Sequence, residues 1–179
     1  RRWQGRLAEM LSDFRELAGV QGIDFGYSLV RYQYDAGERE QALAHYHAVM
    51  LRQPLPPRRD LLGGATLCNL AYLAARGGDS THAPQLYDAL KPLAGSFANT
   101  TVAKPVGEHF LGVLATVLDE PAVADAHFAA AVVAHEKADA PLLVAETRVE
   151  WARLLCGTGD TDRARELLAE VDDTATTHS

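Results

Sequence analysis

The sequence predicts an all-α fold in which antiparallel helix pairs stack as a solenoid. Apolar residues recur at helical spacing along most of the chain, and no segment alternates β-branched and polar residues as a half-buried strand does. A second observation is a pattern that occurs four times: a small residue, a large apolar or aromatic residue four places on, and an apolar residue three places further. The matches are Ala42-Tyr46-Val49, Ala83-Tyr87-Leu90, Ala124-Phe128-Ala131 and Ala164-Leu168-Val171.

A turn signal stands before each of these matches. The segments are Asp35-Ala36-Gly37, Gly77-Gly78-Asp79, Asp119-Glu120-Pro121 and Gly157-Thr158-Gly159-Asp160. Gly and Asp supply left-handed or capping geometry, so each unit is expected to be helix, short turn, helix. The four alanines follow one another at intervals of 41, 41 and 40 residues, whereas the tetratricopeptide motif repeats every ~34 residues. We interpret the chain as tetratricopeptide-like with long connections; the alternative is a helical bundle with accidental periodicity.

The predicted helices form one domain over residues 1–179. They span residues 2–18, 24–35, 38–52, 60–76, 80–93, 104–118, 122–137, 141–156 and 161–173. The predicted capping residues are Asp60, Ser80, Asp160 and Thr161, and Pro84 and Pro141 lie in first turns. An orphan helix within residues 1–20 precedes repeats at about 24–54, 60–94, 104–137 and 141–173. The orphan helix and the absence of an initial Met predict a fragment of a larger multidomain protein; a processed natural start is the alternative.

Composition excludes several classes of protein. The chain has 179 residues, of which 47% are hydrophobic and 23% charged, which is typical of a folded globular protein. No apolar run approaches the ~18 residues of a membrane span. The net charge of -7 disfavours binding to duplex DNA, which is itself a polyanion. Cys68 and Cys156 lie far apart in sequence, and we expect free, buried thiols in a cytoplasmic protein.

Motifs for catalysis or metal binding are missing from the sequence. Gly63-Gly64-Ala65-Thr66 and Gly77-Gly78 lack the Lys of a phosphate-binding loop. His45 and His47 point to different helix faces, and no further ligands complete a zinc site around His127 and His135, so we interpret all four as solvated or packed histidines. We therefore predict no enzyme activity, no cofactor and no metal.

The first helix of each pair is predicted to line a concave recognition surface. Tyr and Arg suit such a surface because they bury area and also make directed hydrogen bonds. The predicted groove residues, which lie on the first helices beside Cys68, Val113, Thr116 and Val149, are Tyr27, Arg31, Tyr34, Tyr72, Arg76, His109, Glu146 and Arg153. For Tyr27, Tyr34 and Tyr72 the alternative is packing between neighbouring units.

Residues 60–172 resemble the C-terminal region of a family of large bacterial signalling proteins. The matching stretches are 86–95 (LYDALKPLAG), 110–118 (FLGVLATVL), 124–128 (ADAHF), 150–155 (EWARLL) and 159–168 (GDTDRARELL). Members carry an ATPase module followed by tetratricopeptide-like repeats, and they end in a LuxR-type helix-turn-helix or begin with an adenylate/guanylate cyclase domain. Where the family tends to have an aromatic residue before the last unit, this chain has Leu142-Leu143, and no ATPase, cyclase or DNA-reading module lies within it.

The resemblance implies a protein–protein interaction scaffold in a bacterial signalling or transcriptional regulator. Its partner would be another protein or another domain of the parent chain, with no contact to nucleic acid or membrane by this segment. The alternative is a sensor domain that binds a small effector in the concave groove. Sequence alone identifies neither the partner nor the effector.

Overall fold

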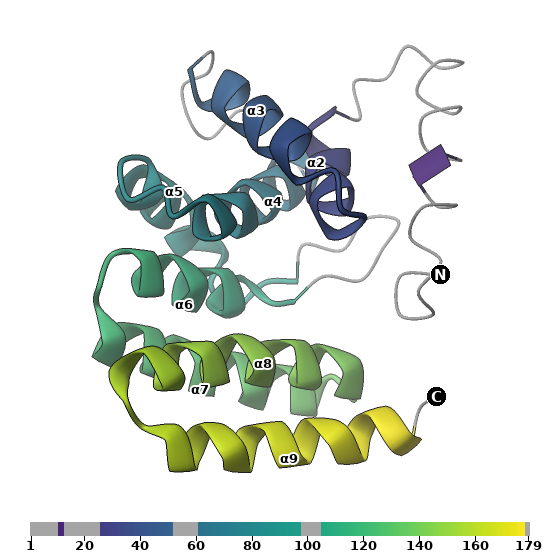
Figure 1. The fold of residues 1–179 in the computed structure, drawn as a ribbon, viewed down its shortest axis with the longest axis vertical. Coiled ribbons are helices and arrows are strands. Elements are labelled where there is room, and N and C mark those ends of the chain that lie inside the picture. The colour runs from purple at the N-terminus through teal and green to yellow at the C-terminus, as the bar shows by residue number, and fades with distance from the viewer. Residues whose placement is uncertain (1–10, 13–25, 52–60, 98–104, 178–179) are drawn as a thin grey trace.

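The computed structural model describes residues 11–12, 26–51, 61–97 and 105–177. These residues form the helices α2 (Gly26–Asp35), α3 (Arg39–Met50), α4 (Leu61–Gly77), α5 (Ala83–Leu90), α6 (Gly107–Val117), α7 (Pro121–Lys137), α8 (Pro141–Thr158) and α9 (Thr161–Thr177), with a 3-10 turn at Lys91–Leu93 (Figure 1). Apart from one isolated antiparallel bridge between Phe97 and Val106, the described residues contain no β-structure. The predicted all-α class is confirmed. The predicted helix 2–18 lies outside the described residues except for Leu11 and Ser12, which are helical.

The helices form antiparallel pairs, and the first helices of successive pairs also contact one another. Consecutive helices run antiparallel, and α2 packs on α3, α4 on α5, α6 on α7, and α8 on α9 (Figure 1). In addition α2 contacts α4, α4 contacts α6, and α6 contacts α8. We call α2, α4, α6 and α8 the first-helix row. Its members bring residues from distant parts of the sequence next to one another.

Left-handed backbone closes the turn inside each pair. The residues concerned are Gly37 (φ 98°), Gly78 (φ 64°), Asp119 (φ 58°) and Gly159 (φ 88°). Each stands in a turn that the sequence predicts. Glycine adopts this conformation without a Cβ penalty, and Asp is among the few other residues that tolerate it.

Several helix boundaries differ from prediction for local reasons. Helix α5 begins at Ala83 and not at Ser80, because Asp79 Oδ1 accepts the backbone N–H groups of Thr81 (3.0 Å) and His82 (3.1 Å) and closes a turn first. The α-helix stops at Leu90 because Pro92, in the 3-10 turn that follows, lacks an N–H donor and disturbs the preceding turn. Helix α9 continues to Thr177, past the predicted end at 173.

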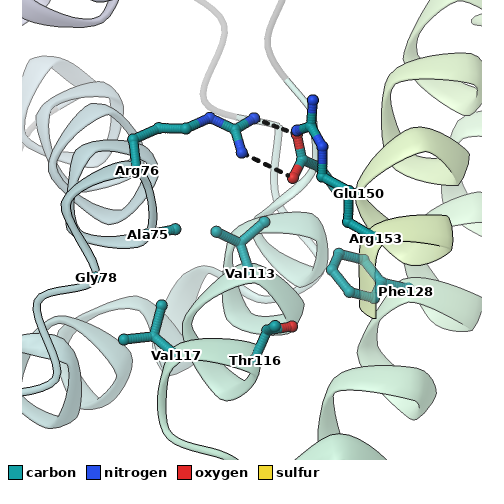
Figure 2. Close-up of a pocket in the computed structure, with 9 residues that line it drawn as sticks. All are labelled: Ala75, Arg76, Gly78, Val113, Thr116, Val117, Phe128, Glu150 and Arg153. Carbon is teal, nitrogen blue, oxygen red and sulfur yellow. Dashed lines mark hydrogen bonds and ion pairs between the residues drawn. The ribbon is translucent and has the colours of Figure 1, made fainter. Parts of the chain in front are cut away.

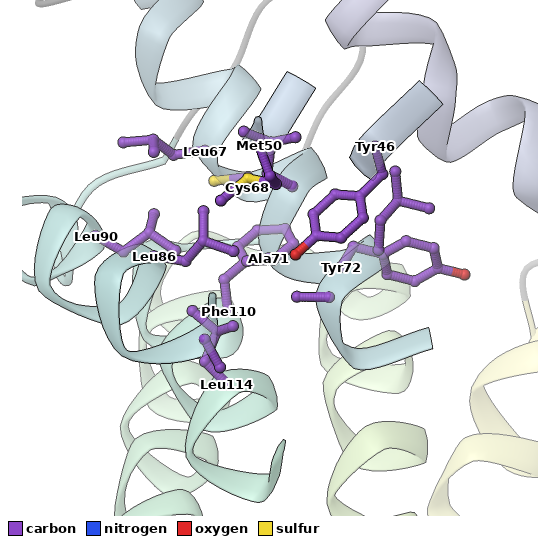
Figure 3. Packing of buried hydrophobic residues seen from close by; sticks show 14 of the residues in the cluster. Tyr46, Met50, Leu67, Cys68, Ala71, Tyr72, Leu86, Leu90, Phe110 and Leu114 are labelled. Carbon is purple, nitrogen blue, oxygen red and sulfur yellow. The ribbon is translucent and has the colours of Figure 1, made fainter. Parts of the chain in front are cut away.

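Burial is organised around small residues that let helices approach closely. Ala42, Ala83, Ala124 and Ala164, one on each second helix, are at most 2% exposed. One apolar cluster centres on α4 and includes Tyr46, Leu73, Leu86 and Phe110 (Figure 3). A second cluster joins α7 and α8 around Phe128 and Trp151.

The two cysteines differ in their surroundings. Cys68 is buried in the α4 cluster, as predicted, and its thiol is free (Figure 3). Cys156 is also a free thiol, but it is exposed, so the prediction of burial is wrong for this residue. On α8 the buried positions near this end are Trp151, Ala152, Leu154 and Leu155, which leaves Arg153 and Cys156 on the solvent side.

Phe128 of α7 packs directly against Gly112 of α6. A Cβ built on Gly112 would lie 2.9 Å from two carbons of the Phe128 ring, so only glycine permits this approach. The ring is buried, and its neighbours include His109 (centroids 6.2 Å apart) and Trp151 (6.5 Å). The tetratricopeptide-like pattern predicts that Phe128 lies between the two helices of its pair, against Leu111 and Gly112, and the contact with Gly112 is present. One aromatic ring thus connects α6, α7 and α8.

Substitutions on either side of this contact should be coupled. Phe128→Ala should lower the free energy of unfolding by ~3–5 kcal/mol because it leaves a cavity in a packed core. Gly112→Ala should lower it by ~1–3 kcal/mol in the wild-type chain, because the new methyl group collides with the ring. In the Phe128→Ala background the same methyl group has room, so most of its effect should disappear. Urea unfolding of the two single variants and the double variant measures this coupling.

Gly157 provides the matched control for Gly112. It lies in α8, and nothing stands within 4 Å of a Cβ built on it. Gly157→Ala should therefore be neutral or stabilise by roughly 0.5–1 kcal/mol through helix propensity. A loss at Gly157 as large as at Gly112 would contradict the steric explanation.

Candidate functional site

A buried ion pair joins the two ends of the first-helix row. Arg31 of α2 donates from Nη2 to Glu146 Oε1 of α8, although the two residues are 115 positions apart. Arg31 is 1% exposed, and its Nε lies 3.8 Å from Asp35 Oδ2. Burial by itself would lower the pKa of Arg31, but the charges of Glu146 and Asp35 outweigh it and the pKa is raised. Arg31 is therefore charged, and its charge is paired with the carboxylates of Glu146 and Asp35 of the same chain.

Tyr72 of α4 lies between two guanidinium groups. The Cζ atom of Arg31 is 4.4 Å from the centre of its ring, and that of Arg76 is 4.6 Å away, which are cation–π distances. The Tyr72 hydroxyl donates to Asp35 Oδ1, and Tyr34 meets the ring edge-on at 6.2 Å. Burial, and then the charge of Asp35, raises the pKa of Tyr72 to about 12. The phenol thus keeps its proton and acts as a donor.

A second ion pair connects α4 to α8. Arg76 donates from Nη1 to Glu150 Oε2 (3.3 Å) and from Nη2 to Oε1, across 74 positions of sequence. Arg153, one turn further along α8, donates to the same Oε1 at 2.6 Å. Burial would raise the pKa of Glu150, but its hydrogen bonds to Arg76 and the charges of Arg76 and Arg153 outweigh it, so the pKa is lowered. Glu150 is ionised at neutral pH and accepts hydrogen bonds from two guanidinium groups.

A cavity of about 310 Å³ lies beside this second ion pair (Figure 2). It is lined by Ala75, Arg76, Gly78, Val113, Thr116, Val117, Phe128, Glu150 and Arg153. A smaller hollow of about 170 Å³ shares Thr116 and Arg153 with it and continues toward Gly157 and Thr158. We call the larger cavity the α4–α6–α8 groove. The Arg76–Glu150 ion pair spans it from α4 to α8 (Figure 2).

The structure separates the predicted groove residues into two sets. Arg76, Glu150 and Arg153 line the groove, and of these only Arg76 and Arg153 belong to the prediction. Arg31 and His109 are each 1% exposed, and Tyr34, Tyr72 and Glu146 belong to the contacts around Arg31. None of these five residues belongs to the lining of the cavity. The side chain of Tyr27 lies outside what the structure describes.

Two carboxylates at this site were not predicted from sequence. Glu150 follows Glu146 by one helical turn, and Asp35 follows Arg31 by one turn. Residues four apart share a helix face, so this spacing is the signal that could have identified both. Because α2 and α8 are far apart in sequence, the sequence does not indicate which arginine pairs with which carboxylate.

His109 and His135 form a buried polar chain with Thr147. The backbone N–H of Val106 donates to His135 Nε2 at 2.9 Å. His135 must then carry its proton on Nδ1, which donates to Thr147 Oγ1 (3.2 Å), and the Thr147 hydroxyl donates to His109 Nδ1 (2.9 Å). Burial lowers the pKa of each histidine to about 4. Both rings are therefore neutral at pH 7.

Tyr87, His127 and Glu108 form another chain, which joins α5, α7 and α6. The Tyr87 hydroxyl donates to His127 Nε2 at 2.7 Å, and His127 Nδ1 faces Glu108 Oε2. The order matches that of a nucleophile, a base and an orienting acid. Burial raises the pKa of Tyr87, however, which is the opposite of what a nucleophilic phenol needs. We interpret this chain as a link between helices.

Metal binding and membrane insertion find no support in the described part of the chain. Its residues contain no group of three His, Cys, Asp or Glu side chains placed to hold a metal ion. Within the same residues, no helix combines the length and apolar character that crossing a bilayer requires. We take the α4–α6–α8 groove, with its three charged side chains, as the candidate site.

Breaking the buried ion pair should be severely destabilising. Arg31→Met leaves Glu146 without its guanidinium partner and should lower the free energy of unfolding by ~3–5 kcal/mol. The double variant Arg31→Met, Glu146→Leu removes both charges, so it should lose less than the sum of the two single variants. Urea unfolding measures all three.

The matched control for this pair is exposed. Arg165 and Asp162 pair at i, i+3 on the outside of α9. Arg165→Met should change stability little, because exposed ion pairs contribute roughly 0–1 kcal/mol. Strictly additive losses at Arg31 and Glu146 would show that the two residues do not depend on each other.

Stability should fall as the pH falls from about 6.5 toward 4. Each buried histidine has a folded-state pKa of about 4 against an ordinary value of 6.5, so the unfolded chain binds more protons in this window. Each can contribute up to about 1.4 kcal/mol per pH unit. His135→Gln keeps one acceptor and one donor without titrating, and should flatten the dependence of the urea midpoint on pH.

Comparisons with known proteins give a likeness of fold. No protein-family model matches the sequence, and no curated protein matches it. Among solved structures, the chain is similar to the crystal structure of BtubC (BKLC) from P. vanneervenii, with a TM-score of 0.55 and 20% sequence identity. The similarity covers 97% of this chain and 72% of the BtubC chain. At this level of identity, the likeness shows a shared helical fold.

Proposed function

We propose that this chain is a tetratricopeptide-like solenoid segment and a non-catalytic scaffold for protein–protein interaction. The left-handed turn residues Gly37, Gly78, Asp119 and Gly159 follow one another at intervals of 41, 41 and 40 residues, which supports the repeat. The buried alanines of the second helices have the same intervals. Each alanine stands five residues after the left-handed turn residue of its pair, so the turn and the packing position recur together, which supports a repeat.

The α4–α6–α8 groove is the observation that carries the proposal. It collects Arg76, Thr116 and Arg153 from three successive first helices along one wall. Arginine is enriched in recognition surfaces because its planar fork makes several directed hydrogen bonds. A partner segment crossing the row would meet a side chain of each helix in turn.

The resemblance to bacterial signalling proteins suggests where such a scaffold works. The matching stretches cover parts of the second helices α5, α7 and α9 and parts of the first helices α6 and α8. We place the chain in a bacterial signalling or transcriptional regulator, with another domain of the parent or a separate protein as partner. Two observations support a non-catalytic role: the described residues hold no group of three side chains that could bind a metal ion, and the raised pKa of Tyr87 disfavours it as a nucleophile.

A small-effector sensor is the second candidate function, and the size of the groove favours it. A volume of about 310 Å³ stands at the lower end of the ~300–1,000 Å³ typical of small-molecule sites. Such a space admits a small molecule or one side chain, and not a folded element. The scaffold and the sensor would use the same groove residues, but a protein segment would occupy the groove in one and a small molecule in the other.

Site-specific photocrosslinking distinguishes the candidates. A photoreactive amino acid at Thr116, in the groove, should crosslink to a protein partner in cells that express the full parent protein. At Val133, on the outer side of α7, it should give at least about tenfold less product. Arg153→Glu should abolish the Thr116 product without changing the helical circular dichroism signal.

Two outcomes would contradict the scaffold. Crosslinks at Val133 as strong as those at Thr116 would place the partner on the outer helices. Absence of any protein crosslink at both positions would leave the effector sensor as the remaining candidate. The control Arg165→Glu, on the exposed side of α9, should leave the Thr116 product unchanged.

A further inference from the structure

Resting on the second candidate function, we infer that the α4–α6–α8 groove binds a small organic carboxylate with an apolar body. The acid group would pair with Arg153 and Arg76 at the rim. The apolar part would lie against Val113 and Val117 of α6. Three properties of the groove lead to this ligand class: its charge, the donors available at its rim, and the chemistry of its lining.

The charges lining the groove do not cancel. Arg76 and Arg153 share the single carboxylate of Glu150, and both hydrogen-bond to its Oε1. Arg31, Glu146 and Asp35 pair with one another and do not line the groove, so they are left out of this count. The lining therefore carries two positive charges and one negative charge, which favours a ligand with one negative charge.

The arginines at the rim of the groove carry more N–H donors than Glu150 accepts. A guanidinium group carries five N–H donors in a planar fork that suits a carboxylate. Arg153 is 56% exposed in its side chain, and among the described residues its one carboxylate partner is Glu150, bonded through Nη1. Arg76 is held in place by Glu150 and by the ring of Tyr72. One arginine is thus adjustable and the other is fixed in position.

The remaining lining is apolar or already bonded. Ala75, Val113, Val117 and Phe128 present hydrocarbon to the cavity. The Thr116 hydroxyl donates to the backbone carbonyl of Gly112 at 2.9 Å. The side chains away from the rim thus offer little to a sugar or another polyol. An acid head at the rim and an apolar body below it match the lining.

Titration with octanoate tests the inference directly on the full chain. Octanoate should bind in a saturable manner at one site, followed by calorimetry or by NMR shifts of the Val113 and Val117 methyl groups. Octylamine, with the same tail and the opposite charge, should bind at least about tenfold more weakly. Acetate, which has the charge without the tail, should also be at least about tenfold weaker.

Variants assign the binding to the groove. Arg153→Gln should weaken octanoate binding by about fivefold or more. Thr116→Phe places a ring in the cavity from an exposed position and should abolish binding. Arg165→Gln, whose guanidinium lies outside the groove on α9, should have no effect.

Three results would overturn the inference. They are equal binding of octanoate and octylamine, octanoate binding that survives both Arg153→Gln and Thr116→Phe, and no saturable octanoate binding at all. Photocrosslinking at Thr116 does not depend on a carboxylate. A groove that crosslinks to a protein but binds no octanoate would thus overturn the ligand class and leave the scaffold standing.

Discussion

The arrangement of the first-helix row depends on the buried contact between Arg31 and Glu146. A guanidinium that is almost fully buried requires an acid beside it, because an unpaired buried charge is strongly unfavourable. Such pairs add little net stability compared with apolar packing. Their effect here is geometric: α8 must lie close enough to α2 for Glu146 to reach Arg31. On the same helix Glu150 pairs with Arg76 and forms part of the lining of the groove.

Two glycines of α6 let its backbone approach neighbouring elements closely. A Cβ on Gly107 would lie 2.1 Å from the carbonyl oxygen of Leu93, and a Cβ on Gly112 would enter the ring of Phe128. The backbone of α6 is therefore close to the 3-10 turn at its beginning and to α7 along its length. The long side chains Arg31 of α2 and Arg76 of α4 reach Glu146 and Glu150 of α8.

Local features of the fold were predictable, and long-range ones were not. The turns with Gly37, Gly78, Asp119 and Gly159 and the contact of Phe128 with Gly112 follow from spacing within a helix pair. The start of α5 was misplaced because Asp79 and Ser80 are both good capping types, and only the structure shows that Asp79 accepts the N–H groups. Arg31 was expected on an open surface, since nothing in the local sequence reveals an acid 115 positions away. Cys156 was wrongly predicted to be buried, because the buried face of α8 ends at Leu155, the residue before it.

The contact between α2 and α8 also changes how the protein should unfold. In stacked helical repeats each unit usually touches only its neighbours, so the ends can fray independently of the middle. Here Glu146 of α8, the last helix of the first-helix row, pairs with Arg31 of α2, the earliest helix of that row that the structure describes. Glu150, which pairs with Arg76, lies one turn from Glu146 on the same helix. Detaching α8 and α9 would release Arg31 and Arg76 together. Loss of the C-terminal pair is therefore not a local event, and the chain is expected to open as one cooperative unit from α2 to α8.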